Sequence, residues 1–212
     1  MKNLARNIRL SVILTAAFFS ASCGSVDEPV NFSTEWPTKS PGYEEAATRW
    51  TRRGVLRAPL EQQASQLMEI YATYLSNDWR AAYVERQSKL QKLNGPRKAE
   101  LAGQQQQTAL AHHEVELLIT TYYQRHNDLH RKRSIWRVTL VDDQGNEIVA
   151  EEVERDRRPR EVIAAEFEHF GDFAEAYVAK FPAAPELLSG KKFSLRVASS
   201  LGMVELDWVS KK

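Results

Sequence analysis

Two pairs of metal-ligating side chains stand at helical spacing in the middle of the chain. His112 and Glu116 are four residues apart, and so are His126 and His130. Residues at i and i+4 lie on one face of a helix, and imidazole and carboxylate groups are common zinc ligands. These residues are therefore candidate metal sites. Both pairs fall at or near the end of a predicted helix, where solvated polar residues are ordinary, so we predict neither a bound metal nor another cofactor.

Motifs for catalysis are missing from the sequence. The segment His113-Glu114-Val115-Glu116-Leu117 begins like the H-E-x-x-H helix of zinc proteases, but Leu117 stands where the second His is required. No G-x-S-x-G elbow is present, and the pair Ser199-Ser200 has no His nearby in the sequence. The nine glycines form neither a dinucleotide-binding fingerprint nor a P-loop. We therefore predict no catalytic residue.

The first 24 residues follow the pattern of an export signal. Three basic residues precede a mostly apolar run from Leu10 to Phe19. As a helix this run is about 15–18 Å long, too short for a bilayer core of about 30 Å. Small residues then lead to Cys23, the only cysteine of the chain. We predict that residues 1–22 are a signal peptide.

The segment Phe19-Ser20-Ala21-Ser22-Cys23-Gly24 resembles the lipobox of bacterial lipoproteins. The resemblance implies that Cys23 is lipidated on its sulfur and its amine and becomes the first residue of the mature chain. It departs from the family at Ser20, where Leu or another apolar residue is usual, so cleavage without lipid is the alternative. No Asp follows the cysteine directly, which implies the outer membrane, with the protein facing the periplasm or the cell surface.

The net charge of the mature chain does not favour a nucleic-acid partner. Removing residues 1–22 takes away three of the 29 basic residues and none of the 28 acidic ones, which leaves a formal net charge of −2. A nearly neutral chain has no basic field to attract nucleic acid. The single cysteine also excludes an internal disulfide. The partners that we predict are the membrane, through the N-terminal lipid, and an envelope protein.

The mature chain begins with a predicted tether and a predicted helical part. Residues 23–42 contain three prolines among polar residues and have little periodic pattern, which is typical of a flexible tether. Residues 43–130 contain two long helical patterns, from Leu60 to Leu93 and from Arg97 to Asn127, with Asn94-Gly95-Pro96 between them. A tight turn between two long helices predicts an antiparallel helical hairpin.

Strand patterns occupy residues 134–210. Apolar and polar residues alternate from Trp136 to Val141 and from Phe193 to Val197, and the run from Ala174 to Phe181 also favours a strand. The segment from Glu161 to His169 fits either a helix or a strand. The core is predicted to contain Trp136, Tyr177, Phe193 and Trp208. The predicted fold class is therefore α+β: an N-terminal antiparallel helical hairpin followed by a small antiparallel β-sandwich.

These patterns favour a membrane-anchored cell-envelope lipoprotein with a binding or scaffold role. The alternative is an envelope hydrolase or metal-dependent enzyme whose site is assembled from dispersed histidines and acids. The positions of the histidines in space discriminate between the two, because an enzyme needs two or three of them in one pocket with a carboxylate. The five histidines are His112, His113, His126, His130 and His169.

Overall fold

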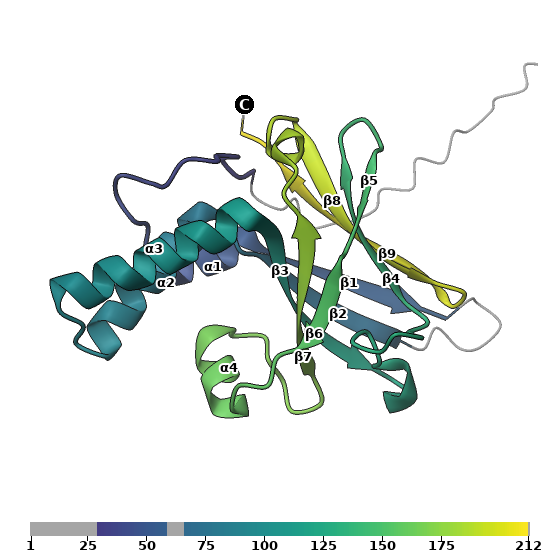
Figure 1. Ribbon diagram of the computed structural model, residues 1–212. Helices are drawn as coiled ribbons and strands as arrows, with labels where there is room; N and C mark the ends of the chain where they lie inside the picture. Colours follow the sequence, from purple (N-terminus) through teal and green to yellow (C-terminus); the bar gives the residue numbers. More distant parts are fainter. Residues whose placement is uncertain (1–28, 59–65, 212) are drawn as a thin grey trace, which may run out of the picture.

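The computed structural model describes residues 29–58 and 66–211, which form four α-helices, two short 3-10 helices and nine β-strands (Figure 1). The predicted signal peptide and Cys23 lie outside the described residues. In chain order the elements are α1 (Tyr43–Trp50), β1 (Thr51–Arg57), β2 (Gln66–Tyr74), α2 (Asn77–Leu90), α3 (Gly95–Ala111), β3 (His112–Thr121), η2 (Gln124–His126), β4 (Arg137–Asp142), β5 (Glu147–Val149), β6 (Glu152–Arg155), α4 (Arg160–Glu166), β7 (Glu175–Pro182), η3 (Pro185–Leu188), β8 (Lys192–Ser199) and β9 (Gly202–Val209).

The strands form two antiparallel sheets that enclose a common core. The first sheet has the order β1-β2-β3-β7-β6 and the second the order β5-β4-β8-β9. Only Ala150 and Glu151 separate β5 from β6, so one short stretch of chain passes from the second sheet to the first. At the other side β1 packs against β9. Gly54 permits this close approach, since a Cβ there would lie 2.4 Å from Cγ1 of Val204.

Aromatic side chains fill the centre between the sheets. The ring of Tyr74 lies 5.1 Å from that of Phe193, which in turn lies 5.1 Å from the ring of Trp208. The indole N–H of Trp208 donates to the backbone oxygen of Trp50 at 3.0 Å. Rings at these separations add to the free energy gained from burying their area. The core prediction for the four aromatic residues is confirmed, because Trp136 is 8% exposed and the other three are fully buried.

Helix α2 packs against α1 and α3 beside the first sheet. Trp79 of α2 stacks between Tyr83 and Phe167, with ring separations of 5.4 and 5.9 Å. Helices α2 and α3 lie side by side and project from the sheets as an arm (Figure 1). No residue of α3 is buried. In the part of the chain that the structure describes, no helix has the length and the apolar character needed to cross a membrane.

The predicted N-terminal helical hairpin is wrong. Strand β2 lies within the first predicted helix and strand β3 within the second, and these two strands pair with each other. The α2–α3 arm is an excursion between two neighbouring strands. β2 pairs with β1 and β3 and has residues on both faces, with Met68 and Ile70 in the core and Leu67 and Tyr71 facing the other way. Such a strand has a nearly continuous apolar pattern, which matches helical spacing as well as strand spacing.

The predicted separate β-sandwich of residues 134–210 is also wrong. Strands β6 and β7 join β1, β2 and β3 in the first sheet, while β4, β5, β8 and β9 form the second. Both halves of the chain therefore build one core, whose buried residues extend from Val30 to Trp208. Local alternation indicates a strand but not its neighbour, so the sequence did not reveal this exchange. Helix α4 (Arg160–Glu166) covers most of the ambiguous segment from Glu161 to His169, which is therefore a helix and not a strand.

The end of the predicted tether contacts the folded body. Val30 forms a parallel bridge with Ser210, and its backbone N–H donates to the oxygen of Val209 at 2.8 Å. Val30 is fully buried and Phe32 is 4% exposed. The ring of Phe32 lies 5.1 Å from that of Phe193. From Pro29 onward this segment is thus part of the fold, and it positions the residues that follow it.

Candidate functional site

A groove of about 570 Å³ lies where the helical arm joins the sheets. Four segments form it: residues 33–36, the turn between β2 and α2, the end of α3 with the start of β3, and the connection from β7 through η3. These segments are far apart in the sequence. Small-molecule sites in proteins measure about 300–1,000 Å³, so this groove has the size of a ligand site.

The N-terminal segment forms one wall of the groove. The side-chain amide of Asn77, the first residue of α2, donates to the backbone oxygen of Thr34 at 2.9 Å. This bond fixes the segment beside the β2–α2 turn. Trp36 is partly buried and lines the groove. An aromatic side chain on a wall held by a backbone contact can pack against a ligand without much loss of conformational freedom.

The floor of the groove is a buried tyrosine–histidine pair. The hydroxyl of Tyr74 lies 2.8 Å from Nδ1 of His113, and Nε2 of His113 lies 3.1 Å from the backbone nitrogen and 3.0 Å from the backbone oxygen of Ala184. Burial lowers the pKa of His113, so the ring is neutral at physiological pH. In either tautomer Tyr74 keeps hydrogen-bonding capacity toward the groove, since one bond to His113 uses only part of it.

The rim of the groove is apolar. Leu110, near the end of α3, is 76% exposed, and Pro185 and Leu188 of η3 also line the groove. None of the described lining residues is Asp, Glu, Lys or Arg. A groove without Asp, Glu, Lys or Arg side chains disfavours ionic ligands, because a charge loses its hydration there without a strong ionic partner. The site is therefore suited to an uncharged ligand with a large apolar part and a few hydrogen-bonding groups.

Among the described groove residues, no serine or threonine hydroxyl is hydrogen-bonded to a base, and the hydroxyl next to His113 is that of the buried Tyr74. Both ring nitrogens of His113 are occupied by Tyr74 and Ala184. The hydroxyl of Ser76, a potential nucleophile, accepts the backbone N–H of Trp79 and caps α2. Covalent catalysis requires a nucleophile within hydrogen-bond reach of its base.

The candidate pair His112 and Glu116 does not share a helix face. Both residues belong to strand β3, where positions four apart are separated by about 13 Å. His112 lines the groove, and its Nε2 lies 3.7 Å from a carboxylate oxygen of Glu151. Glu116 is buried beneath α4 instead. The two side chains cannot ligate one metal ion at this separation.

The remaining histidines lie in three different surroundings. The ring of His126 is 5.5 Å from Tyr123, that of His130 is 5.9 Å from Tyr177, and that of His169 is 4.3 Å from Tyr71. Within residues 29–58 and 66–211 no three His, Cys, Asp or Glu side chains are placed to hold a metal ion. The convergence that the enzyme hypothesis required is limited to the neighbours His112 and His113.

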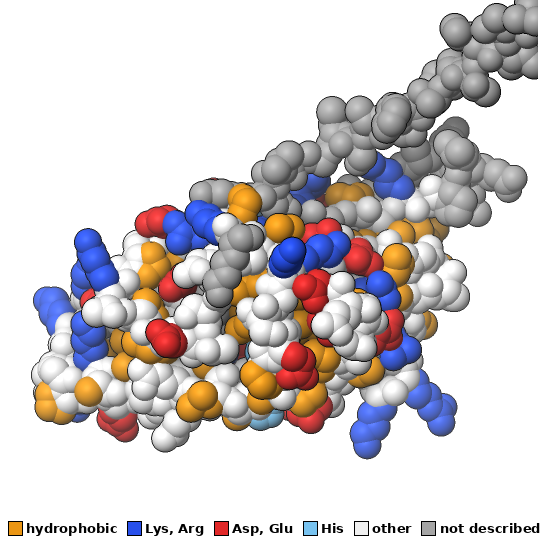
Figure 2. Space-filling model, turned by 90° about the horizontal axis from the view of Figure 1, so that it is seen from above, with side chains coloured by type: hydrophobic (Ala, Val, Ile, Leu, Met, Phe, Trp, Pro, Cys, Tyr) orange, Lys and Arg blue, Asp and Glu red, His pale blue; other side chains and the backbone are white. Residues whose placement is uncertain are grey.

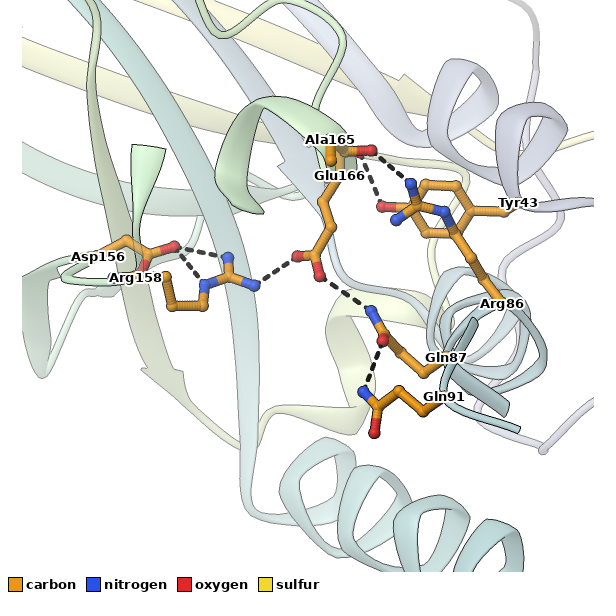
Figure 3. Close-up of polar contacts among 8 residues, drawn as sticks. All are labelled: Tyr43, Arg86, Gln87, Gln91, Asp156, Arg158, Ala165 and Glu166. Carbon is orange, nitrogen blue, oxygen red and sulfur yellow. Dashed lines mark hydrogen bonds and ion pairs between the residues drawn. The ribbon is translucent and has the colours of Figure 1, made fainter. Parts of the chain in front are cut away.

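A second polar cluster fastens α4 to the rest of the fold (Figure 3). Arg158 makes a paired contact with the carboxylate of Asp156, at 2.8 Å from Nε and 2.5 Å from Nη2, and a further ion pair with Glu166. The other carboxylate oxygen of Glu166 accepts the amide of Gln87 from α2 at 3.0 Å. Backbone oxygens at the end of α4 accept further bonds from Tyr43 and Arg86. The side chains of Asp156 and Glu166 are only 5% and 4% exposed, so this cluster is a structural joint.

Glu116 adds a third carboxylate to this joint. It is 2% exposed, and its Oε1 has no hydrogen-bond donor among the described residues. Burial, together with the charge of Asp156, raises the pKa of Glu116 well above its usual range. Burial also acts to raise the pKa of Asp156, but the bonds from Arg158 outweigh it and the pKa falls. A protonated Glu116 can donate a hydrogen bond to the ionised Asp156.

Replacing Glu116 by Gln should stabilise the protein at alkaline pH. The unfolded chain ionises Glu116 near pH 4.5, whereas the folded chain keeps the proton to a higher pH. The folded state therefore loses stability as the pH rises through this window. The amide introduced by Glu116→Gln would retain a donor toward Asp156 without this cost. We expect a gain of about 1–3 kcal/mol at pH 8 that shrinks toward pH 4.5, measured by urea unfolding.

The exposed Glu168 provides the matched control for this measurement. Glu168→Gln removes the same charge outside the joint and should change the free energy of unfolding by less than about 0.5 kcal/mol at either pH. An equal loss of stability for Glu116→Gln at pH 4.5 and pH 8 would refute the protonated state.

The sequence singled out two of the groove residues, His112 and His113, as candidates for metal or catalytic chemistry, and missed the others. Leu110 had one visible signal, since it is an apolar residue outside the stripe of its helix and follows the polar run Gln104 to Gln107. Trp36 stood in a segment interpreted as a tether. Tyr74 and Leu188 had no signal of a site, because only the fold brings them together.

Comparison of the chain with models of protein families, with curated proteins and with solved structures finds no match.

Proposed function

We propose that this chain is a lipid-anchored cell-envelope protein that binds an uncharged, largely apolar ligand in the groove. The observation that carries the binding role is the groove itself, with its apolar rim, its neutral Tyr74–His113 floor and its lack of charged lining residues in the described chain. The proposed anchor is lipid on Cys23. The proposed location is the outer membrane, and an envelope protein is the proposed macromolecular partner.

The position of the groove supports a ligand taken from the membrane. Ser33 and Trp36 line it, and Ser33 follows Cys23 by ten residues. Ten residues span at most about 35 Å. A lipid on Cys23 would thus hold the groove within that distance of the bilayer, which is the main reservoir of uncharged apolar molecules in an envelope.

The test is titration of the protein with the neutral apolar dye N-phenyl-1-naphthylamine, followed by dye fluorescence. The variant Leu110→Asp places a carboxylate on the rim and should weaken dye binding at least tenfold, because burial of an unpaired charge is costly. Leu90→Asp is the matched control, since Leu90 is also on the arm, is 65% exposed and lies outside the groove. Equal binding by the parent and both variants would exclude the groove as the ligand site.

A further inference from the structure

A basic and aromatic surface lies at the end of the sheets opposite to the groove. The segment from Tyr122 to Arg137 contains five basic residues and one acid. Its exposed members include Tyr122, Tyr123, Arg125, Arg131, Lys132 and Arg133, which we call the η2 patch after the short helix among them. Basic side chains project from the molecule at the end away from the helical arm (Figure 2).

Among the described residues, no carboxylate forms an ion pair with the exposed basic side chains of the η2 patch. Asp128, the acid of this segment, is 8% exposed and its carboxylate accepts the hydroxyl of Ser134 at 3.0 Å. Among the described residues, Arg125, Arg131, Lys132 and Arg133 form no salt bridge with a carboxylate. Arg137, at the border of the patch, is the exception and pairs with Glu147 at 3.1 Å. A net positive field therefore faces solvent here although the whole mature chain is slightly acidic.

The patch is carried by an ordered loop. The buried amide of Asn127 donates to the backbone oxygen of Ile119 at 2.9 Å and accepts the hydroxyl of Tyr177 at 2.8 Å. The indole N–H of Trp136 donates to the backbone oxygen of His126 at 2.6 Å. These bonds hold the loop at both ends. The tyrosines nevertheless remain outside, with Tyr122 68% and Tyr123 48% exposed.

We propose that the η2 patch binds an anionic phospholipid surface. Lysine and arginine are attracted to the negative potential of acidic lipids, and tyrosine rings are enriched at the headgroup level of membranes. Arg125 lies over the ring of Tyr123 at 5.2 Å, so the two kinds of group are presented together. An acidic protein or a nucleic acid would satisfy the charges, but would not require two exposed tyrosines beside them.

The geometry allows the patch and the proposed anchor to contact one membrane. Val30 bridges Ser210 after the end of β9, whereas Arg137 pairs with Ala198 beside the β8–β9 turn, so patch and tether lie at opposite ends of the second sheet. The eight residues of β9 span about 26 Å, and the seven residues from Cys23 to Val30 reach at most about 25 Å. The strands would then lie along the membrane surface. This placement alone depends on the proposed anchoring.

The experiment is co-sedimentation with vesicles. It uses the mature chain, residues 23–212, with Cys23→Ala, which retains every described element and excludes lipid from the result. Vesicles of phosphatidylcholine with phosphatidylglycerol are compared with vesicles of phosphatidylcholine alone. We expect binding to the anionic vesicles only, weakening steeply with salt. Arg131→Gln, Lys132→Gln and Arg133→Gln together should lower the affinity about a hundredfold.

The matched control removes three basic residues at the exposed tip of the helical arm, with Lys89→Gln, Lys92→Gln and Arg97→Gln. This variant has the same net charge and should bind within about threefold of the parent. Equal losses in both triple variants would reduce the effect to net charge and overturn the proposal. Tighter binding of a DNA duplex than of anionic vesicles at the same salt would overturn it as well. Thermal unfolding verifies that all three proteins are folded.

Discussion

Replacing Cys23 by Ala is expected to move the protein from the membrane fraction to the soluble fraction. Several acyl chains anchor a protein far more firmly than the marginal hold of one, so their loss should release nearly all of it in a high-salt buffer that screens the η2 patch. The measurement is fractionation of cells followed by mass spectrometry of the mature N-terminus. In the parent protein the spectrum should show an acylated first residue at Cys23, and in the variant no acyl mass.

Ser25→Ala is the control for this experiment, because it changes a neighbouring small residue and leaves the cysteine intact. It should remain with the membrane. An unmodified thiol on the parent, or a mature chain that begins elsewhere, would contradict the anchor. The groove could still be tested in that case, since its dye titration does not depend on the lipid.

Replacing Arg80 by Met should cause the largest loss of stability, about 3–5 kcal/mol. Arg80 is 2% exposed and joins three elements: its Nη2 lies 2.8 Å from Glu114 of β3, its Nη1 donates to Gln105 of α3 at 2.9 Å, and its Nε donates to the oxygen of Leu75 at 2.9 Å. The variant leaves the carboxylate of Glu114 largely buried without its cation. Urea unfolding measures the effect.

Two further variants separate the buried pair from ordinary surface charge. The double variant Arg80→Met with Glu114→Gln removes both charges and should recover part of the loss, because no unpaired ion remains. Arg53 and Glu69 form an exposed pair at 2.7 Å, and Arg53→Met should cost less than about 1 kcal/mol. Suppose that Arg80→Met lowered the free energy of unfolding no more than Arg53→Met does. The contacts of Arg80 at the base of the arm would then not stabilise the fold.

The sequence predicted secondary structure correctly where its hydrophobic pattern fits only one kind of element. The segments predicted as strands near Trp136, Ala174 and Phe193 are strands in the structure. The hydrophobic pattern led to a wrong prediction of helix where a strand is buried on both faces. In β3 the run Ile119-Thr120-Thr121 is typical of a strand, but the helical spacing of Val115, Leu118 and Tyr122 dominated the interpretation.

The pairing of strands was beyond a local reading of the sequence. Strand β7 pairs with β3, which precedes it by more than 50 residues. The residues of neither segment indicate which strand it pairs with. The groove depends on the same long-range contacts, because its walls come from four separate segments. The charge of the η2 patch, by contrast, was visible as Arg131-Lys132-Arg133. Only the structure shows that its one acid is turned inward.

The groove and the η2 patch, which have the two proposed roles, lie at opposite ends of the described molecule. The uncharged groove is on the side of the N-terminal segment, and the basic surface is on the other side of the strands. A protein held at a membrane at both ends could exchange an apolar molecule with the bilayer without a long path through water. The groove is central to this function, because without a ligand the membrane contacts would serve only to position the protein.

Native mass spectrometry of the mature protein purified from its own membranes tests the groove most directly. We expect an uncharged small molecule to remain bound to the parent and to the Leu90→Asp control, and to be lost from Leu110→Asp. A parent protein that carries no such molecule and also fails to bind the neutral dye would contradict the proposed binding role.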